Sequence, residues 1–229
     1  QMIDGKRVLG VVPARGGSKG IPRKNLQLVS GKSLLGWTIE VAQQSTLIDY
    51  LMVSTEDLEI AEEAKRYGCE VPFLRAAELA TDTADAISVP LDAAMRCSGY
   101  DLLVLLAPTS PLRISEDIDG AIEKCVSSNA PACVSVCLVE ENPYWMFTLG
   151  EGDRMIAVAP EIPPRRQELP QAYILNGAVY VARTEWLKRE GRFLTPETVA
   201  FQMPRSRSLD IDTEADLNRF SRMVGSKLS

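Results

Sequence analysis

The stretch VVPARGGSKGIPRKN, residues 11–25, decides how the rest of this chain is interpreted. It starts as the end of an apolar strand and continues into a loop with three glycines, which let backbone N–H groups approach a ligand closely. The loop also carries four cations, namely Arg15, Lys19, Arg23 and Lys24. Glycines and cations at the carboxyl end of a strand suit a polyphosphate, and a solvated basic turn is the alternative. The loop is not a Walker A motif, because Lys19 is followed by Gly20 rather than Ser or Thr.

Around this loop, strand patterns alternate with helix patterns, which is typical of a parallel sheet covered on both faces. The predicted strands cover residues 7–13, 50–54, 70–74, 101–106, 132–139, 179–182 and 199–203. The predicted helices cover residues 34–44, 56–67, 85–98, 117–127, 185–189 and 213–224. The run DLLVLL, residues 101–106, is apolar on both faces, as a central parallel strand is. The rigid turn APTSPLR, residues 107–113, follows it, at the sheet edge where open α/β folds bind ligands.

Composition limits the function. The chain has 229 residues and a formal net charge of -6, so the length suits one domain and the basic loop is a local feature of an acidic protein. This balance argues against a general nucleic-acid surface and favours a small anionic ligand. No apolar run reaches the roughly 18 residues of a membrane span, and the start of the sequence lacks a signal-peptide pattern. We therefore expect a cytoplasmic protein that binds neither nucleic acid nor membrane.

The absence of histidine restricts the chemistry further. It excludes Ser-His-Asp and Cys-His catalysis and the usual imidazole zinc sites. The five cysteines form no CxxC pair and lie in apolar segments, which favours buried thiols over a metal site or disulfides. Catalysis must then depend on carboxylates, Lys, Arg, Tyr and a metal that prefers oxygen ligands.

Two aspartates near the end of the chain, Asp210 and Asp212, are candidates for such a metal site. In an extended segment their carboxylates project to the same side, and paired carboxylates of this kind hold Mg²⁺ that also bridges substrate phosphates. The alternative is a solvated pair at a helix N-terminus, since Thr213 and Asp216 predict a capping box there.

Several blocks of sequence, taken in order, resemble one family. They are ARGGSKGIPRKN (14–25), VSTEDLEIAEEAKRYG (53–68), LRAAELATDTAD (74–85), LAPTSPLR (106–113), PRRQELPQAY (164–173), NGAVY (176–180) and SLDIDTEADL (208–217). This order resembles that of the CMP-sialic acid synthetases, or acylneuraminate cytidylyltransferases, which join CTP to a nine-carbon α-keto acid sugar. The resemblance covers nearly all of residues 8–217. It implies a three-layer, Rossmann-like nucleotidyltransferase fold of the nucleotide-diphospho-sugar transferase type, with a mainly parallel sheet.

The resemblance also implies roles for individual residues. The implied CTP ligands are Arg15, Lys19, Lys24, Asn25 and Arg75. Asp210 and Asp212 match aspartates that bind Mg²⁺, and Asp212, Arg15 and Lys19 are expected to act in catalysis. Arg166 matches an active-site arginine, which would hold the carboxylate of the keto acid or the phosphates. Tyr180 and Phe193 match positions that line the sugar pocket; without the resemblance, both would be interpreted as core aromatics.

Residues 140–173 are rich in proline and contain exposed-looking aromatics without strong periodicity, which is typical of a functional or interfacial excursion. In the resembled family this region is a dimerisation arm that reaches the neighbouring subunit's site. We therefore expect one domain, residues 1–229, that forms a homodimer through this arm.

Some alternatives remain open. This chain has Ala86, Ala107 and Ile174 where relatives carry serine, glutamine and, in some, arginine, so the sugar could be a legionaminic, pseudaminic or deaminated relative of N-acetylneuraminate. An eight-carbon Kdo synthetase is a rival with the same chemistry, although its loop typically ends PGKPL where this chain has SKGIPRKN. A nucleotidyltransferase that uses another base and a non-catalytic CTP-binding sensor are further alternatives.

Overall fold

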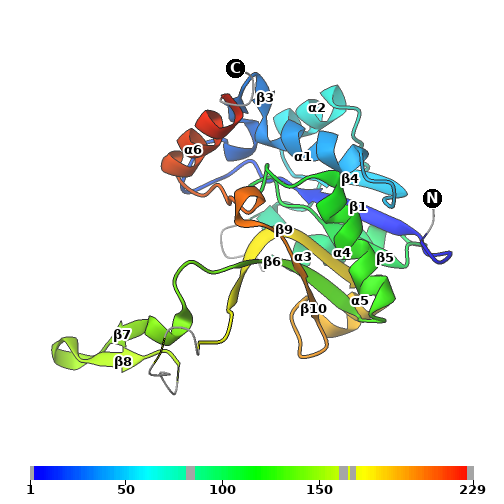
Figure 1. The fold of residues 1–229 in the computed structure, drawn as a ribbon. Coiled ribbons are helices and arrows are strands. Elements are labelled where there is room, and N and C mark those ends of the chain that lie inside the picture. The colour runs from blue at the N-terminus through cyan, green and yellow to red at the C-terminus, as the bar shows by residue number, and fades with distance from the viewer. Residues whose placement is uncertain (1–2, 81–85, 160–164, 166–168, 226–229) are drawn as a thin grey trace.

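The computed structural model describes residues 3–80, 86–159, 165 and 169–225. Its centre is a six-stranded sheet in the order β10-β6-β9-β5-β1-β4 (Figure 1). The strands are β1 (Val8–Pro13), β4 (Tyr50–Ser54), β5 (Leu102–Leu105), β6 (Ala132–Leu138), β9 (Tyr173–Arg183) and β10 (Val199–Gln202). β1 runs parallel to β4 and β5, and β10 runs parallel to β6, whereas β9 is antiparallel to both of its neighbours. The predicted α/β class with a mainly parallel sheet is confirmed.

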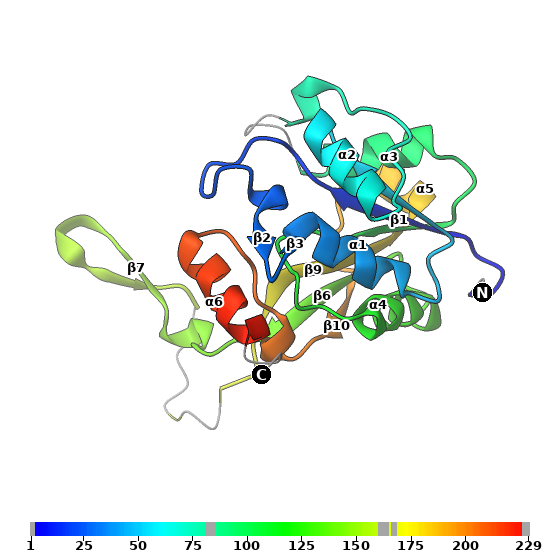
Figure 2. The same ribbon diagram turned by 90° about the horizontal axis from the view of Figure 1, so that it is seen from above.

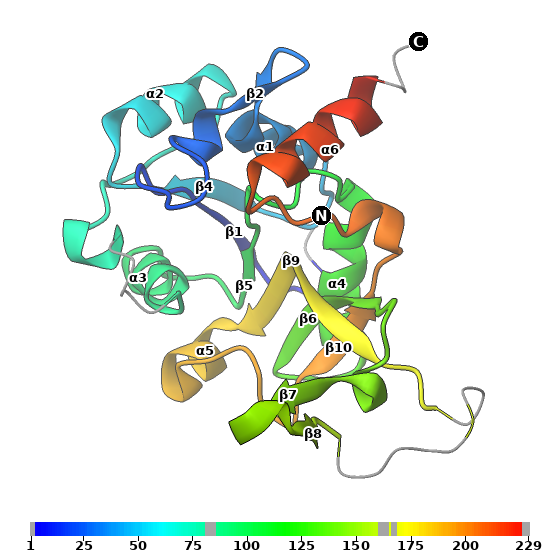
Figure 3. The same ribbon diagram turned by 90° about the vertical axis from the view of Figure 1, so that its left-hand side faces the viewer.

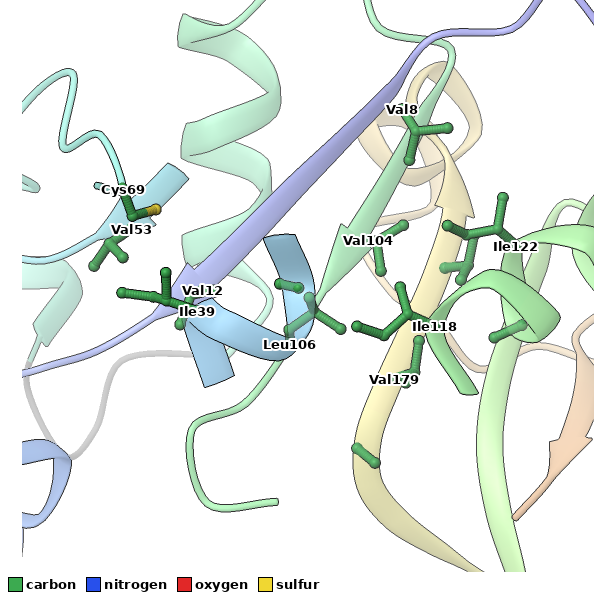
Figure 4. Packing of buried hydrophobic residues seen from close by; sticks show 14 of the residues in the cluster. Val8, Val12, Ile39, Val53, Cys69, Val104, Leu106, Ile118, Ile122 and Val179 are labelled. Atoms are coloured by element: carbon green, nitrogen blue, oxygen red, sulfur yellow. The ribbon is translucent and has the colours of Figure 1, made fainter. Parts of the chain in front are cut away.

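Helices cover both faces of this sheet (Figure 2). α1 (Leu34–Gln43), α2 (Leu58–Arg66) and α4 (Ser115–Ser127) share one buried cluster with the strands, and α3 (Ser88–Arg96) and α5 (Thr184–Glu190) share the other. Figure 4 shows the first cluster, in which side chains of α1 and α4 lie among those of β1 and β5. These residues are almost all Val, Ile, Leu and Ala, so the driving force is the burial of apolar surface.

A third, smaller cluster attaches the C-terminal helix α6 (Glu214–Gly225) to the body. Phe220 is fully buried there and meets Trp37 edge to face, with 5.4 Å between the ring centroids. Ile211 belongs to the same cluster and is also fully buried. The packing of α6 therefore fixes the backbone between the two predicted metal ligands.

Side chains cap the first turns of two helices, one of them as predicted. Asp57 caps α2 by accepting hydrogen bonds from the N–H groups of Glu59 and Ile60, at 2.9 and 3.1 Å. At α6, the Thr213 hydroxyl accepts from the Asp216 N–H at 3.3 Å, and the Asp216 carboxylate accepts from the Thr213 N–H at 2.9 Å. This reciprocal pair is the predicted capping box.

Three predicted elements differ in the structure. The strand expected at residues 70–74 consists only of isolated bridges at Glu70 and Leu74, because Pro72 between them has no N–H to donate. The helix expected at 85–98 begins at Ser88, with Pro90 in its first turn, and Asp85 lies outside the described residues. The strand expected at 179–182 runs over the whole of β9, because pairing with β6 extends it beyond the apolar run.

Short elements complete the description. They are the strands β2 (Leu28–Val29), β3 (Lys32–Ser33), β7 (Phe147–Leu149) and β8 (Met155–Ala157), and the 3-10 turns η1 (Lys24–Leu26), η2 (Ala77–Ala80), η3 (Pro143–Trp145), η4 (Glu151–Asp153) and η6 (Arg205–Arg207). The β7–β8 hairpin, which the sequence did not predict, stands away from the body in Figures 1 and 2, and in Figure 3, where its side faces the viewer, it lies in front of the body. Within the described ranges, no helix is both long and apolar enough to cross a membrane.

Candidate active site

The loop after β1 and the segment that carries Asp210 and Asp212 lie against each other. The Lys24 ammonium donates hydrogen bonds to the Asp212 carboxylate and to the Ile211 carbonyl, both at 3.0 Å. A Cβ atom on Gly20 would lie only 2.4 Å from the Asp212 carbonyl oxygen, so only glycine permits this approach. Segments from opposite ends of the chain therefore form one continuous surface.

A cavity of about 450 Å³ opens beside this contact, at the carboxyl ends of β1 and β5. Four of the five predicted CTP ligands line it, namely Arg15, Lys24, Asn25 and Arg75. The fifth, Lys19, lies on the exposed part of the loop. The cavity thus combines backbone, guanidinium and ammonium donors, the groups that bind a nucleotide triphosphate.

Local contacts give the loop its shape. Asn25 is 8% exposed, and its amide donates to the Arg15 carbonyl at 3.0 Å, so this side chain closes the loop. Arg23 has φ of 52° and directs its guanidinium out of the cavity to Asp57, at 2.5 and 3.0 Å, and to Glu59 at 2.6 Å. The hydrogen bond from Arg23 lowers the pKa of Asp57. The expectation that all four loop cations serve a polyphosphate is therefore wrong for Arg23, because two carboxylates already neutralise it.

Arg75 is held almost completely out of solvent at the cavity wall. It is 5% exposed, and its backbone N–H donates to the Thr55 carbonyl at 2.8 Å. Its Nε atom is buried and has no hydrogen-bond partner among the described residues. A buried donor without a partner costs free energy, so this arginine is kept at the cavity wall at some expense of stability.

Asp210 and Asp212 do not line this cavity themselves but are hydrogen-bonded to two residues that do, Thr109 and Lys24. Thr109 ties this segment to the turn after β5: its carbonyl accepts from the Ile211 N–H at 2.8 Å, and Asp210 accepts a hydrogen bond from its side chain. Partial burial raises the pKa of Asp210, and the nearby charge of Asp212 raises it further. The ionised pair is thus unfavourable by itself, and a divalent cation would relieve the repulsion. Two carboxylates fit Mg²⁺ that takes its remaining ligands from water and phosphate.

Behind the aspartates lies a buried polar network that the sequence analysis did not identify. Asn176 accepts from the Ser135 hydroxyl at 2.6 Å and donates to the Ser208 hydroxyl at 2.9 Å, two residues before Asp210. Gly177 has φ of 70°, and a Cβ there would lie 3.8 Å from the Asp210 carboxylate. The NGAVY block could have revealed this bend, since a glycine inside a strand pattern often indicates a bulge.

Arg113 is a second support that the sequence analysis did not identify. It is fully buried and donates to the Ala107 and Ala178 carbonyls at 2.9 and 2.8 Å, and to the Thr38 hydroxyl at 2.9 Å. Burial lowers its pKa to about 9. One guanidinium thus joins the turn after β5, strand β9 and helix α1 behind the cavity.

The predicted sugar-pocket residues are only partly brought to the site. Tyr180 and Phe193 pack together with 5.4 Å between ring centroids. Burial raises the pKa of Tyr180, and the charge of Asp210 adds to this, so the phenol lies within electrostatic reach of that aspartate. Phe193 is 8% exposed inside the cluster of α3 and α5, which is the position of a core aromatic. Arg166 lies outside the described residues, and the neighbouring Arg165 is exposed.

The family model for Cytidylyltransferase matches residues 9–156. The chain is 36% identical over 221 residues to the CMP-N,N'-diacetyllegionaminic acid synthase of Legionella pneumophila, with 92% of this chain and 93% of that protein covered. It is 37% identical over 218 residues to an N-acylneuraminate cytidylyltransferase of Streptococcus agalactiae, covering 94% of this chain but 52% of that protein.

A solved structure of CMP:2-keto-3-deoxy-manno-octonic acid synthetase in complex with CTP is similar with a TM-score of 0.77. The alignment covers 96% of this chain and 99% of that one, at 15% sequence identity. At this identity the similarity shows the fold.

Proposed function

The chain belongs to the cytidylyltransferase family, and from this premise we propose that it joins CTP to a nine-carbon α-keto acid sugar, giving the CMP-sugar and pyrophosphate. The predicted resemblance to the CMP-sialic acid synthetases is confirmed by the family match and the two relatives. The observation that supports the reaction best is the contact between the glycine loop and the aspartate segment, through Lys24 and Asp212 at 3.0 Å.

The proposed chemistry is in-line attack of the anomeric hydroxyl on the α-phosphorus, with pyrophosphate leaving. Arg15 and Lys19 would stabilise the leaving phosphates, while Lys24 and Asn25 would anchor the triphosphate and the ribose or base. Arg75 would bind the nucleotide from the wall of the cavity.

Mg²⁺ is the proposed cofactor, with Asp210 and Asp212 as its protein ligands. When bound, it would neutralise charge on the phosphates and acidify the attacking hydroxyl. Thr109 and the buried Ile211 hold the segment that carries the two carboxylates next to the cavity.

The substituents of the sugar are the finer part of the proposal. One relative is named for N,N'-diacetyllegionaminic acid and the other for N-acylneuraminate, so we propose a sialic-acid-like sugar of one of these types. Ala86 and Ala107 line the cavity without offering a polar side chain, which favours a sugar other than N-acetylneuraminate itself. Tyr180 would form part of the sugar wall, with Phe193 packed against it from the core, and Arg166 would hold the carboxylate with its planar fork.

A homodimer through residues 140–173 is also proposed. The β7–β8 hairpin exposes large apolar side chains, with Leu149 68% and Met155 64% exposed. Such a surface on a projecting hairpin favours burial against a second copy. Sedimentation at micromolar concentration tests this: Leu149→Glu should shift the protein toward monomer, and a wild-type monomer would exclude the proposal.

A pyrophosphate-release assay tests the reaction. The wild type should release pyrophosphate with CTP, Mg²⁺ and at least one member of a panel of nine-carbon α-keto acid sugars, and Asp212→Asn should not, although it folds. If CTP binds but no sugar supports pyrophosphate release, the sensor is favoured. Pyrophosphate release only with Kdo would favour the eight-carbon substrate. Pyrophosphate release with UTP or GTP in place of CTP would indicate another base.

A further inference from the structure

One carboxylate contacts both the glycine loop and Arg75, an arginine of the cavity wall. Glu56 follows β4, and one of its oxygens accepts the Gly16 N–H at 2.7 Å. The other oxygen accepts from Nη2 of Arg75, also at 2.7 Å. The Glu56 side chain is 19% exposed and that of Arg75 only 2%, so water screens this pair weakly.

The negative charge of Glu56 opposes the binding of a polyanion in the cavity, so Glu56 can favour binding only through its contacts. A carboxylate only accepts hydrogen bonds, and here it fixes two donors at once: a backbone N–H of the glycine loop and one nitrogen of Arg75. With Nη2 held by Glu56, the guanidinium cannot rotate freely, so Arg75 is fixed in one orientation at the wall of the cavity.

Asp57, the next residue, has a different task. It pairs with Arg23 and caps α2, so it ties the outer side of the loop to the body. Glu56 instead accepts hydrogen bonds from the Gly16 N–H of the loop and from Arg75. The two neighbouring acids thus act on different groups, and only Glu56 touches an arginine of the cavity wall.

We propose that Glu56 is a positioning residue of the nucleotide site, which orders the glycine loop through the Gly16 N–H and orients Arg75 for the triphosphate of CTP. This inference deepens the proposed function and rests on it. It does not depend on the identity of the sugar, because it concerns the binding of CTP alone.

The test is the affinity for CTP of Glu56→Gln, measured by calorimetry without sugar. Glutamine keeps the size of the side chain but offers Arg75 a neutral partner, and losing a charge-assisted bond should weaken CTP binding by about tenfold to a hundredfold. The KM for the sugar at saturating CTP should stay within about twofold of the wild-type value. A general loss of structure would instead weaken the binding of CTP and of the sugar together. Glu62→Gln, an exposed change of the same chemistry on α2, is the matched control and should bind CTP as the wild type does.

A double variant tests whether Glu56 acts through Arg75. Arg75→Lys should weaken CTP binding by itself, and Glu56→Gln with Arg75→Lys should lose less than the product of the two single losses, because Glu56 acts partly through Arg75. Should Glu56→Gln unfold, Glu56→Asp replaces it, since its shorter side chain cannot reach both donors.

Wild-type CTP affinity in the folded Glu56 variant, or equal losses for CTP and sugar, would overturn the inference while leaving the proposed function intact. Failure of the wild type to bind CTP at all would overturn both.

Discussion

Replacing Gly20 with alanine tests the contact on which the site depends. A Cβ at this position would lie 2.4 Å from the carbonyl oxygen of Asp212 and 3.6 Å from its carbon. Normal contact needs a separation of at least about 3.4 Å, so the two segments must move apart by roughly 1 Å. Both partners are backbone, and no flexible side-chain end can yield instead.

The displacement acts directly on groups of the proposed active site. Lys24 spans the same gap with hydrogen bonds of 3.0 Å to Asp212 and Ile211, which a shift of this size would break. A misplacement of about 1 Å can cost on the order of a hundredfold in rate, so we expect that loss in kcat/KM for CTP. The forced shift should also lower the free energy of unfolding by about 1–3 kcal/mol.

The assay is steady-state pyrophosphate release, with urea unfolding measured on the same samples. Gly225→Ala is the control, because a Cβ at that end of α6 meets nothing within 4 Å and should leave both quantities nearly unchanged. A Gly20→Ala enzyme with kcat/KM within about threefold of the wild-type value would refute the reasoning, because the loop and the aspartate segment would then not need to meet.

Three further predictions concern stability. Because the pKa of Asp210 is raised, its contribution to stability is present below its unfolded pKa and is lost as the pH rises through the folded value. Asp210→Asn should therefore raise the melting temperature at pH 7 without metal, and it should abolish turnover. The lowered pKa of Asp57 has the opposite effect on stability: its stabilisation is present above the unfolded pKa near 4 and is lost as the pH falls. Asp57→Asn can still cap α2 but no longer titrates. In an acid titration this variant should therefore lose less stability than the wild type below about pH 4. Phe220→Ala should lower the free energy of unfolding by about 3–5 kcal/mol in urea, followed by the fluorescence of the adjacent Trp37, and an unchanged midpoint would contradict the packing of α6.

Much of the fold was predictable because its signals are local. The apolar run of β5, the helix periodicity of α4 and the Thr213–Asp216 box each depend on residues within a few positions of one another. The extension of β9 was not predictable in this way, because Tyr173 and Ile174 become a strand only through pairing with β6. The β7–β8 hairpin was not predicted either, because its strands have only three residues each, which is too few to show alternation of apolar and polar residues.

By itself the sequence determined the α/β class, and it singled out the glycine and cation loop and the aspartate pair as the candidate site, because the chemistry of glycines, cations and carboxylates does not depend on where the fold places them. Only the tertiary structure decided which of them are available. Arg23 is neutralised by acids that lie 34 and 36 positions away, and Lys24 meets a carboxylate 188 positions away. Such pairings depend on the order of strands in the sheet, and no local pattern encodes that order.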